Sequence, residues 1–348
     1  MDTALTGGHG LLPPIKLRPS RSEGLPDVDE VRSGAPSEQT RRILFASAEA
    51  YPFVKVGGLA DVSSALPKRL AELGFDVRLV IPGYRGLGGN QVQTFEVPLG
   101  PIAERVVVRR LPPLGGVDVF ALDIPGWFDR EVPYSYHDDD VMPFVLFSKA
   151  ITTLAAQDGW RPDVIHCNDW HCGLVAQDAR QGPHRSALER TGIVFTIHNI
   201  AYQGRVGAAT DKLTGLPPAG TMLERGIAFA DRVNTVSPRY LREILTPAQG
   251  AGMDGLLRDR GDAARGILNG IDYEEFNPGT TRGSPPATTA RSPSESARTR
   301  MSCSGSATWI ARRTVRCSAW SPGWYRRREW ACCPRHWSRS SPAGPRWW

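Results

Sequence analysis

Short apolar runs rich in β-branched residues alternate with longer segments of helical periodicity between residues 43 and 268. Parallel strands need long crossover connections, which helices usually supply, so this alternation is typical of an α/β fold with a parallel sheet. About 235 residues are enough to bury the core of one such domain. Strands are expected at Ile43–Ala46, Val77–Ile81, Val106–Val108, Val117–Leu122, Val164–His166, Ile193–Ile197, Arg232–Val236 and Gly266–Leu268, and helices at Asp61–Leu73, Pro143–Ala156, Gly173–Ala179 and Pro238–Leu245.

Polar residues gather in the loops that follow these strands. In open α/β sheets ligands collect beyond the carboxyl ends of the strands, so these loops are where a site is expected. The residues are Gly57 and Gly58 after the first strand, Asp169 and His171 after the fifth, His198 after the sixth and Asn269 after the last.

The first of these loops is a glycine turn that carries a lysine, Lys55-Val56-Gly57-Gly58-Leu59. The order strand, glycine turn, helix presents backbone N–H groups and a cation to a phosphate. A tight βα turn without a ligand accounts for a glycine pair about as often, so the turn alone decides nothing.

Residues 48 to 62, A-E-A-Y-P-F-V-K-V-G-G-L-A-D-V, resemble the opening segment of bacterial glycogen synthases and plant starch synthases. Four further segments follow in that family's order and extend the resemblance over roughly residues 42 to 278. They are N-D-W-H at 168–171, T-I-H-N-I-A-Y-Q-G at 196–204, T-V-S-P at 235–238 and L-N-G-I-D at 268–272. The resemblance implies a Rossmann-like parallel-sheet domain, the N-terminal half of a two-domain (GT-B) glycosyltransferase.

The implied reaction belongs to glycogen biosynthesis. Glucose passes from ADP-glucose to the 4-hydroxyl at the non-reducing end of an α-1,4-glucan, with retention of configuration. No cofactor or metal is implied, because cations and oriented N–H donors can stabilise the leaving diphosphate. The residues that contact the base lie in the second domain, and the resemblance to the bacterial and plant branch favours ADP-glucose over UDP-glucose.

By resemblance, the glycine turn serves the donor. Lys55 would lie on the nucleotide sugar, with the N–H groups of Gly57 and Gly58 facing its phosphates; alone, Lys55 reads as an ordinary surface lysine. Asp61 would contact the sugar, although a carboxylate in the first turn of a helix is also explained by the helix dipole.

Four more residues are assigned to the sugar pocket by the same resemblance. Asp169 would lie close to the transferred glucose, where N-capping of the next helix is the alternative. His198 would hydrogen-bond the donor glucose and support charge at the reacting carbon, where a buried core histidine is the alternative. Asn269 would reach the donor site or simply form a turn. Tyr136, in Y-S-Y-H-D at 134–138, matches a loop near the sugar.

Two clusters could be mistaken for metal sites. His166, Cys167, His171 and Cys172 have the spacing H-C-x₃-H-C, which matches no common structural zinc pattern. The acidic run 138–140 reads as a capping or solvated segment before the next helix. Cys167 and Cys172 are the only cysteines before residue 279, which fits a reducing cytoplasm.

Composition changes abruptly after Pro278. Residues 279–348 hold 13 Arg and no Lys, 7 of the 10 Trp and 4 of the 6 Cys, and no Leu, Phe, Asp, Asn or Gln. With two Glu the tail carries +11, so residues 1–278 carry 6 − 11 = −5. An Arg- and Trp-rich arm can bind nucleic acid through phosphate contacts and stacking. A displaced reading frame is the competing explanation.

The genetic code tests that explanation. When the last base of each codon is joined to the first two of the next, residues 320–333 can encode V-S-R-L-V-x-x-K-G-V-G-L-L. This resembles the segment V-S-R-L…K-G with which the family begins its second domain, whose arginine and lysine hold the donor diphosphate. We infer that residues after Pro278 are translated out of frame, and we do not expect a nucleic-acid partner.

Three parts are therefore expected: an extension at 1–40 without apolar periodicity, a catalytic-type domain at 41–278 and the tail at 279–348. The extension lacks the apolar core of a secretory signal, and no run reaches the ~20 apolar residues of a membrane helix, so a soluble, cytoplasmic protein is expected. Without the second domain, the chain is expected to have little transferase activity. The alternatives are a non-catalytic α-glucan-binding fragment and a nucleic-acid-binding arm.

Overall fold

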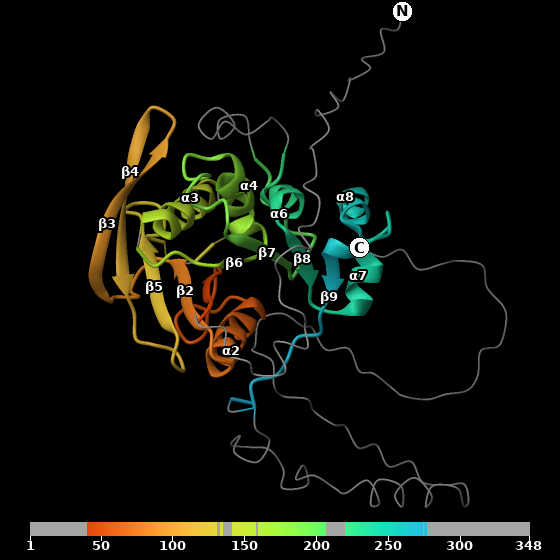
Figure 1. Ribbon diagram of the computed structural model, residues 1–348, viewed down its shortest axis with the longest axis horizontal. Helices are drawn as coiled ribbons and strands as arrows, with labels where there is room; N and C mark the ends of the chain where they lie inside the picture. The colour runs from red at the N-terminus through yellow and green to blue at the C-terminus, as the bar shows by residue number, and fades with distance from the viewer. Residues whose placement is uncertain are drawn as a thin grey trace, which may run out of the picture. The chain divides into compact units, whose positions relative to one another are not determined.

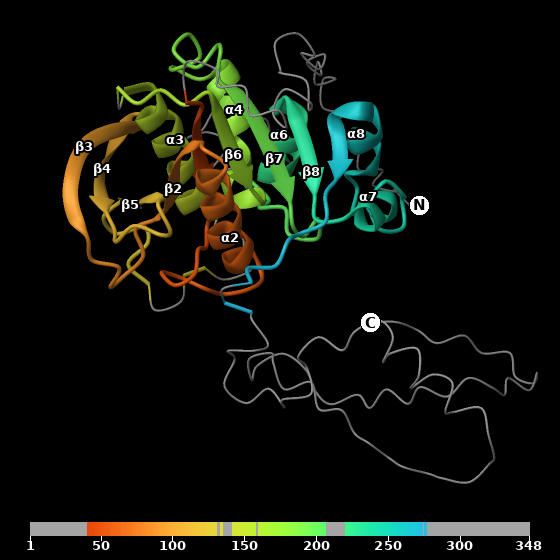
Figure 2. The ribbon, with the colours of Figure 1, turned by 60° about the horizontal axis from the view of Figure 1, so that its bottom comes forward.

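The computed structural model describes residues 40–130, 133–134, 141–157, 159–206, 220–273 and 275–276. These residues form a nine-stranded sheet with the strand order β3-β4-β5-β2-β1-β6-β7-β8-β9 (Figures 1 and 2). The strands are β1 (Arg42–Ala46), β2 (Asp76–Pro82), β3 (Asn90–Leu99), β4 (Ile102–Arg110), β5 (Asp118–Asp123), β6 (Val164–Asn168), β7 (Gly192–Ile197), β8 (Arg232–Thr235) and β9 (Ala264–Gly266).

All strands from β5 to β9 along the sheet pair in parallel, as the alternation of strands and helices predicts. The helices are α2 (Leu59–Glu72), α3 (Val141–Gln157), α4 (Gly173–Gln181), α6 (Met222–Phe229), α7 (Pro238–Ile244) and α8 (Asp254–Asp259), with 3₁₀ turns η2 (Trp170–Cys172) and η3 (Gly261–Ala263). Figure 1 shows α3, α4 and α6 on one face of the sheet and α2 on the other. Right-handed crossovers require this arrangement. The connection from β1 to β2 steps across the sheet in one direction, whereas the connections from β6 to β7 and from β7 to β8 step in the opposite direction.

The predicted strands and helices all occur within about four residues of their expected bounds. The last strand is Ala264–Gly266, so the expected Gly266–Leu268 is wrong by two residues. Ile267 and Leu268 are apolar yet 58% and 75% exposed, although the N–H of Ile267 still donates to the carbonyl oxygen of Thr235 on β8 at 2.8 Å. An apolar pair in the sequence favours a buried strand, but these two side chains are not buried in the fold.

Three elements were not predicted. Strand β3 pairs antiparallel with β4, which in turn pairs antiparallel with β5, so the sheet is mixed at one end. Its alternation was a usable signal, because Phe95, Val97 and Leu99 are buried and their neighbours exposed. The other two are helix α6 and the short helix α8, which has six residues.

Helix α6 was missed because Gly226 stands in its interior, where glycine usually weakens a helix. A Cβ at Gly226 would lie 2.4 Å from the ring of Phe195 on β7, so the close approach of helix and sheet requires glycine here. The sequence still carried a start signal: Thr221 and Glu224 form a capping box, each side chain accepting the other's backbone N–H.

The core lies between the sheet and α3. Phe144 and Phe147 of α3 are fully buried, and the ring of Phe128 meets both edge to face at 5.7 and 6.3 Å. Helix α3 is buried on most sides, which explains why it is apolar almost throughout. No helix among the described residues is long and apolar enough to cross a membrane.

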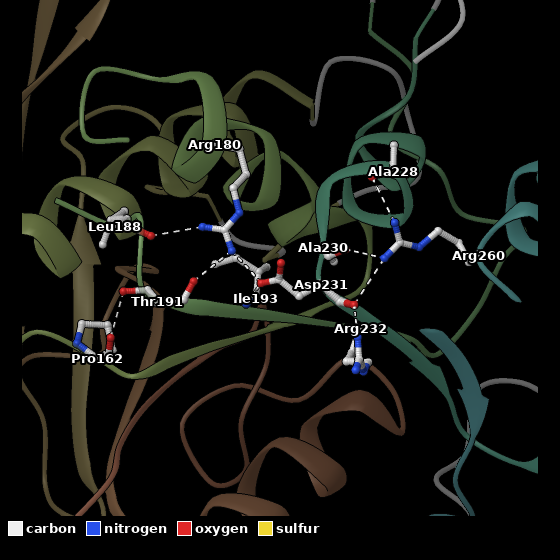
Figure 3. Close-up of polar contacts among 10 residues, drawn as sticks. All are labelled: Pro162, Arg180, Leu188, Thr191, Ile193, Ala228, Ala230, Asp231, Arg232 and Arg260. Atoms are coloured by element: carbon white, nitrogen blue, oxygen red, sulfur yellow. Dashed lines mark hydrogen bonds and ion pairs between the residues drawn. The ribbon is translucent and has the colours of Figure 1, made fainter. Parts of the chain in front are cut away.

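Two arginines, largely buried Arg180 and buried Arg260, join the connections at the amino ends of β7 and β8 (Figure 3). Arg180 of α4 donates to the carbonyl oxygens of Leu188 and Thr191 at 3.1 and 2.9 Å and to Asp231 Oδ2 at 2.6 Å. Arg260 donates to the carbonyl oxygens of Ala228, in the last turn of α6, and of Ala230 and Asp231 just beyond it. These contacts lie at the opposite end of the strands from the loops expected to carry the site.

Candidate functional site

A cavity of about 410 Å³, here called the central pocket, opens beyond the carboxyl ends of β1, β6, β7 and β8. This is where ligands are expected in an open α/β sheet. Its described lining residues are Glu49, Gly57, Gly58, Leu59, Tyr134, Asp169, Trp170, His171, His198, Asn199, Tyr202, Val236 and Asn269. The fold thus brings together six residues expected from sequence: Gly57, Gly58, Asp169, His171, His198 and Asn269.

Asp169 follows β6 and joins two loops of the pocket. Its Oδ1 accepts the N–H of His198 at 2.7 Å and the N–H of Asn199 at 3.2 Å. The side chain makes no capping hydrogen bond to η2, so N-capping is not what this carboxylate does. Its φ of 55° with ψ of 179° is a backbone conformation that residues other than glycine rarely adopt and that costs about 1–3 kcal/mol.

Burial raises the pKa of the Asp169 carboxyl from 3.8 to about 7. The two N–H donors oppose the shift, and the nearby charge of Glu49 adds to it. Asp169 therefore exchanges its proton near neutral pH, in the range useful to a group that gives or takes a proton.

His198 follows β7 and is neutral at pH 7, because burial lowers its pKa to about 4. Its Nε2 lies 3.0 Å from Oδ1 of Asn168, whose Nδ2 donates to the carbonyl oxygen of Ala46 at 3.0 Å. A carbonyl oxygen only accepts, so Oδ1 of Asn168 faces His198 and Nε2 carries the proton. The imidazole is thereby held in one tautomer at the pocket wall.

Gly57 and Gly58 of the glycine turn line the central pocket, but Lys55 of the same turn does not. Nζ of Lys55 is 2.5 Å from Oδ1 of Asp61, in the first turn of α2, and neither residue is among the described lining residues. A Cβ added to Gly57 or Gly58 would meet no atom within 4 Å, so open space adjoins the turn.

Asn269 lies at the boundary between the central pocket and a second cavity on the α2 side of the sheet. Its N–H donates to the carbonyl oxygen of Val236 at 3.3 Å, which sets the chain just after β9. Tyr136 and the acidic run 138–140 lie outside the described residues.

Sequence reasoning missed Glu49, Tyr134 and Trp170 as pocket residues. Glu49 had a signal, since it is the only charged side chain between Phe45 and Val54 and directly follows a buried strand. His171 is buried against Trp170, with ring centroids 4.1 Å apart, and neither ring nitrogen has a hydrogen-bond partner among the described residues. Burial lowers its pKa to about 3, so it too is neutral.

The four histidines and cysteines of the H-C-x₃-H-C segment do not face a common point. His166 lines the second cavity, where Nε2 lies 2.6 Å from Oγ1 of Thr196, whereas His171 lines the central pocket. Burial raises the pKa of Cys172 to about 12 and that of Cys167 well above its ordinary value, which keeps both thiols protonated. Zinc binds thiolates, so this set is poorly suited to it.

Tyr240 of α7 holds the loop that carries His198. Its hydroxyl oxygen accepts the N–H of buried Ile200 at 3.0 Å. We predict that Tyr240→Phe leaves this N–H without a partner and lowers the free energy of unfolding by about 1–2 kcal/mol. Urea denaturation measures the change, with Tyr273→Phe, at a 78% exposed tyrosine, as the control. A Tyr240→Phe midpoint equal to that of the control would contradict the prediction.

Residues 42–259 match the family described as "Starch synthase catalytic domain". Glycogen synthase of Thioalkalivibrio sulfidiphilus is 42% identical over 267 residues, which cover 69% of this chain and 54% of that protein. Glycogen synthase of Moorella thermoacetica is 39% identical over 257 residues, covering 69% and 53%. The chain spans about half the length of the curated relatives it matches.

The same similarity appears among solved structures. The catalytic domain of Starch Synthase IV from Arabidopsis thaliana, bound to ADP and acarbose, superposes with a TM-score of 0.63 at 28% identity. The match covers 70% of this chain and 54% of that one.

Proposed function

This chain belongs to the glycogen synthase and starch synthase family, and from that premise we propose that its central pocket is one half of a glucosyltransferase site. The donor is ADP-glucose, the acceptor is glycogen or another α-1,4-glucan, and glucose is transferred to the 4-hydroxyl at its non-reducing end with retention. The protein acts in the cytoplasm, in glycogen biosynthesis.

The chemistry of the pocket wall carries this proposal. The described lining residues include two carboxyl groups, two neutral imidazoles and three aromatic rings, and none of them is Lys or Arg. Such a wall offers hydrogen-bond acceptors and flat apolar surfaces, which suit a neutral sugar better than a phosphate. The central pocket therefore fits the glucosyl groups, and the diphosphate lies at its edge, beside the glycine turn.

His198 and Asp169 have distinct roles in this proposal. Transfer makes the sugar oxocarbenium-like while the diphosphate leaves with added negative charge. Neutral His198, with its Nε2 proton committed to Asn168, hydrogen-bonds the donor glucose and supports charge at the reacting carbon. The Asp169 carboxylate lies close to the transferred glucose and, when ionised, stabilises the positive charge that develops there.

The other donor contacts come from the glycine turn and its neighbours. Lys55, Gly57, Gly58, Asp61 and Asn269 line the donor's path, and Tyr136 approaches the sugar. Lys55 is paired with Asp61 here, so engaging a donor requires that pair to open. The larger share of diphosphate stabilisation belongs to a second domain whose beginning is readable in the displaced frame of residues 320–333.

The transfer assay tests the whole proposal. We predict that the purified 348-residue chain incorporates labelled glucose from ADP-glucose into glycogen at no more than about a thousandth of the rate of the product of a frame-restored gene, because residues 320–333 do not supply the V-S-R-L…K-G cations in the frame that is translated. Resequencing the DNA for residues 270–335 precedes the experiment. Transfer by the 348-residue chain at a comparable rate would contradict this account of the tail, and an inactive frame-restored protein would contradict the proposed reaction.

A non-catalytic glucan-binding role is the second candidate, because the aromatic rings of Trp170, Tyr134 and Tyr202 line the pocket. The sugar units of a glucan can stack on such rings without any nucleotide sugar being bound. Retention of the 348-residue chain on a glycogen affinity gel, with no turnover of ADP-glucose, would support this role.

A further inference from the structure

The carboxylate of Glu49 lies where the glycine turn meets the central pocket. Its Oε2 accepts the N–H of Val56 at 2.6 Å and the N–H of Gly57 at 2.8 Å. The hydroxyl of Tyr134, another lining residue, donates to Oε1. Glu49 is only 2% exposed, so these contacts are made out of bulk water. Two N–H groups of the turn are thus already occupied by a side chain of the protein.

The segment that carries Glu49 is held in place on both sides. Oγ of Ser47 accepts the N–H of Glu49 at 3.3 Å and the hydroxyl of Ser63, on α2, at 2.8 Å. The N–H of Ser47 donates to the carbonyl oxygen of Val80 on β2 at 3.1 Å, and the hydroxyl of Tyr84 donates to that of Ala48 at 3.0 Å. A carboxylate mounted in this way is preorganised and imposes its position on the turn.

We propose that Glu49 is a positioning residue that sets the glycine turn so that the N–H of Gly58, and not those of Val56 and Gly57, faces the ligand. This inference rests on the proposed use of the turn for the donor's diphosphate. Gly58 directly precedes α2, lines the pocket and has open space where a Cβ would stand. Because Gly58 is the N-cap of α2, its N–H and those of the first turn lie at the positive end of the helix dipole, which favours an anion.

Electrostatics give Glu49 a second effect. A carboxylate fixed on the N–H groups of Val56 and Gly57 repels a phosphate from that part of the turn. It therefore directs the anion one step further along the chain, toward Gly58 and the start of α2. The opposite reading is that Glu49 merely fills the phosphate position until a ligand displaces it, and the two readings predict opposite effects of removing the carboxylate.

The experiment compares Glu49→Ala and Glu49→Gln in the 348-residue chain, with Glu72→Ala as control for the loss of one negative charge at an exposed site. Amide hydrogen exchange followed by NMR reports the hydrogen bonds directly. We expect exchange at Val56 and Gly57 to accelerate at least 30-fold in Glu49→Ala and less than 5-fold in Glu49→Gln, because the amide oxygen still accepts. Unchanged exchange in Glu49→Ala would overturn the proposal.

Titration with inorganic pyrophosphate reports the positioning. In the unmodified chain we expect the Gly58 amide to shift while those of Val56 and Gly57 stay unchanged. Affinity is expected to fall at least 10-fold in Glu49→Ala and to recover to within 3-fold in Glu49→Gln. Tighter binding by Glu49→Ala would overturn the proposal in favour of a displaceable occupant. If the unmodified chain binds no pyrophosphate, the proposed diphosphate role of the turn fails in this chain, and hydrogen exchange still decides whether Glu49 holds the turn.

Discussion

Asp169→Asn is expected to raise the melting temperature at pH 7.5 by about 5 °C while removing most of the function of the central pocket. The carboxyl group is buried with a pKa of about 7, against 3.8 in the unfolded chain. Each pKa unit is worth ~1.4 kcal/mol, so the charge costs at most about 4 kcal/mol at high pH. Asparagine removes that cost and keeps an oxygen for the N–H groups of His198 and Asn199.

The sign of the pH dependence follows from the raised pKa. Between pH 3.8 and about 7 the folded protein holds a proton that the unfolded chain has lost. Stability therefore falls as the pH rises through this window, by up to ~1.4 kcal/mol per unit, and is constant with respect to this group below and above it. Asp169→Asn is expected to flatten the decline, so its advantage grows from pH 4 to pH 7.

Asparagine is the suitable replacement because it tolerates a positive φ better than most residues, which Asp169 requires at 55°. Urea denaturation at pH 4.5, 6 and 7.5 measures the effect, with Asp259→Asn as the control, since that carboxylate is exposed. In the frame-restored protein the same change is expected to lower the transfer rate at least ~100-fold, because a charge near the reacting sugar is lost. A variant that is destabilised, or that keeps the original pH slope, would show that Asp169 carries no buried proton.

Arg180→Met is expected to be the most destabilising substitution among those considered, at about 2–4 kcal/mol. The arginine side chain is 10% exposed and satisfies two backbone carbonyl groups and Asp231 Oδ2, which also accepts the N–H of Ile193 at 2.8 Å. Methionine fills a similar volume but removes the donor to the carbonyl oxygen of Thr191, while that of Leu188 keeps only the N–H of Thr191 at 3.2 Å. The carboxylate of Asp231 also loses its nearest cation in a partly buried position.

Thermal unfolding measures this change, with a drop of about 5–12 °C expected for a domain of this size. Arg190→Met is the matched control, because Arg190 lies on the same connection and is exposed. The double variant Arg180→Met, Asp231→Asn is expected to recover part of the loss, since the unpaired charge is gone. If it is as unstable as the sum of the single variants, Arg180 and Asp231 are energetically independent.

The fold could be predicted from sequence because burial leaves a periodic record. The apolar runs that became β1, β2, β6 and β7 are buried on both faces of a parallel sheet, and their bounds were predicted within two residues. Helix α6 was not predicted, because Gly226 serves a contact with Phe195 that is 31 residues away in the chain. Its low helix propensity is explained only by the close approach of helix to sheet.

The site could be predicted in outline for a related reason. Strands of one parallel sheet end at the same edge, so Asp169 and His198 had to be neighbours once their strands were known. Their partners could not be predicted from the chain. From the sequence, the Asp169 carboxylate could either cap η2 or accept hydrogen bonds from the loop after β7. Only the folded structure shows that it binds the loop.

By itself the sequence determined the parallel sheet, the loops that carry polar chemistry and the point after Pro278 where the composition changes. These three features depend on residue types and their spacing over short stretches of the chain, which the sequence shows directly. Only the tertiary structure decided that Glu49 occupies the N–H groups of the glycine turn, that Lys55 pairs with Asp61, and that Asp169 holds its proton to about pH 7. Those outcomes depend on which polar groups share a buried space, and the free energy of sharing it is set by packing between segments far apart in the chain.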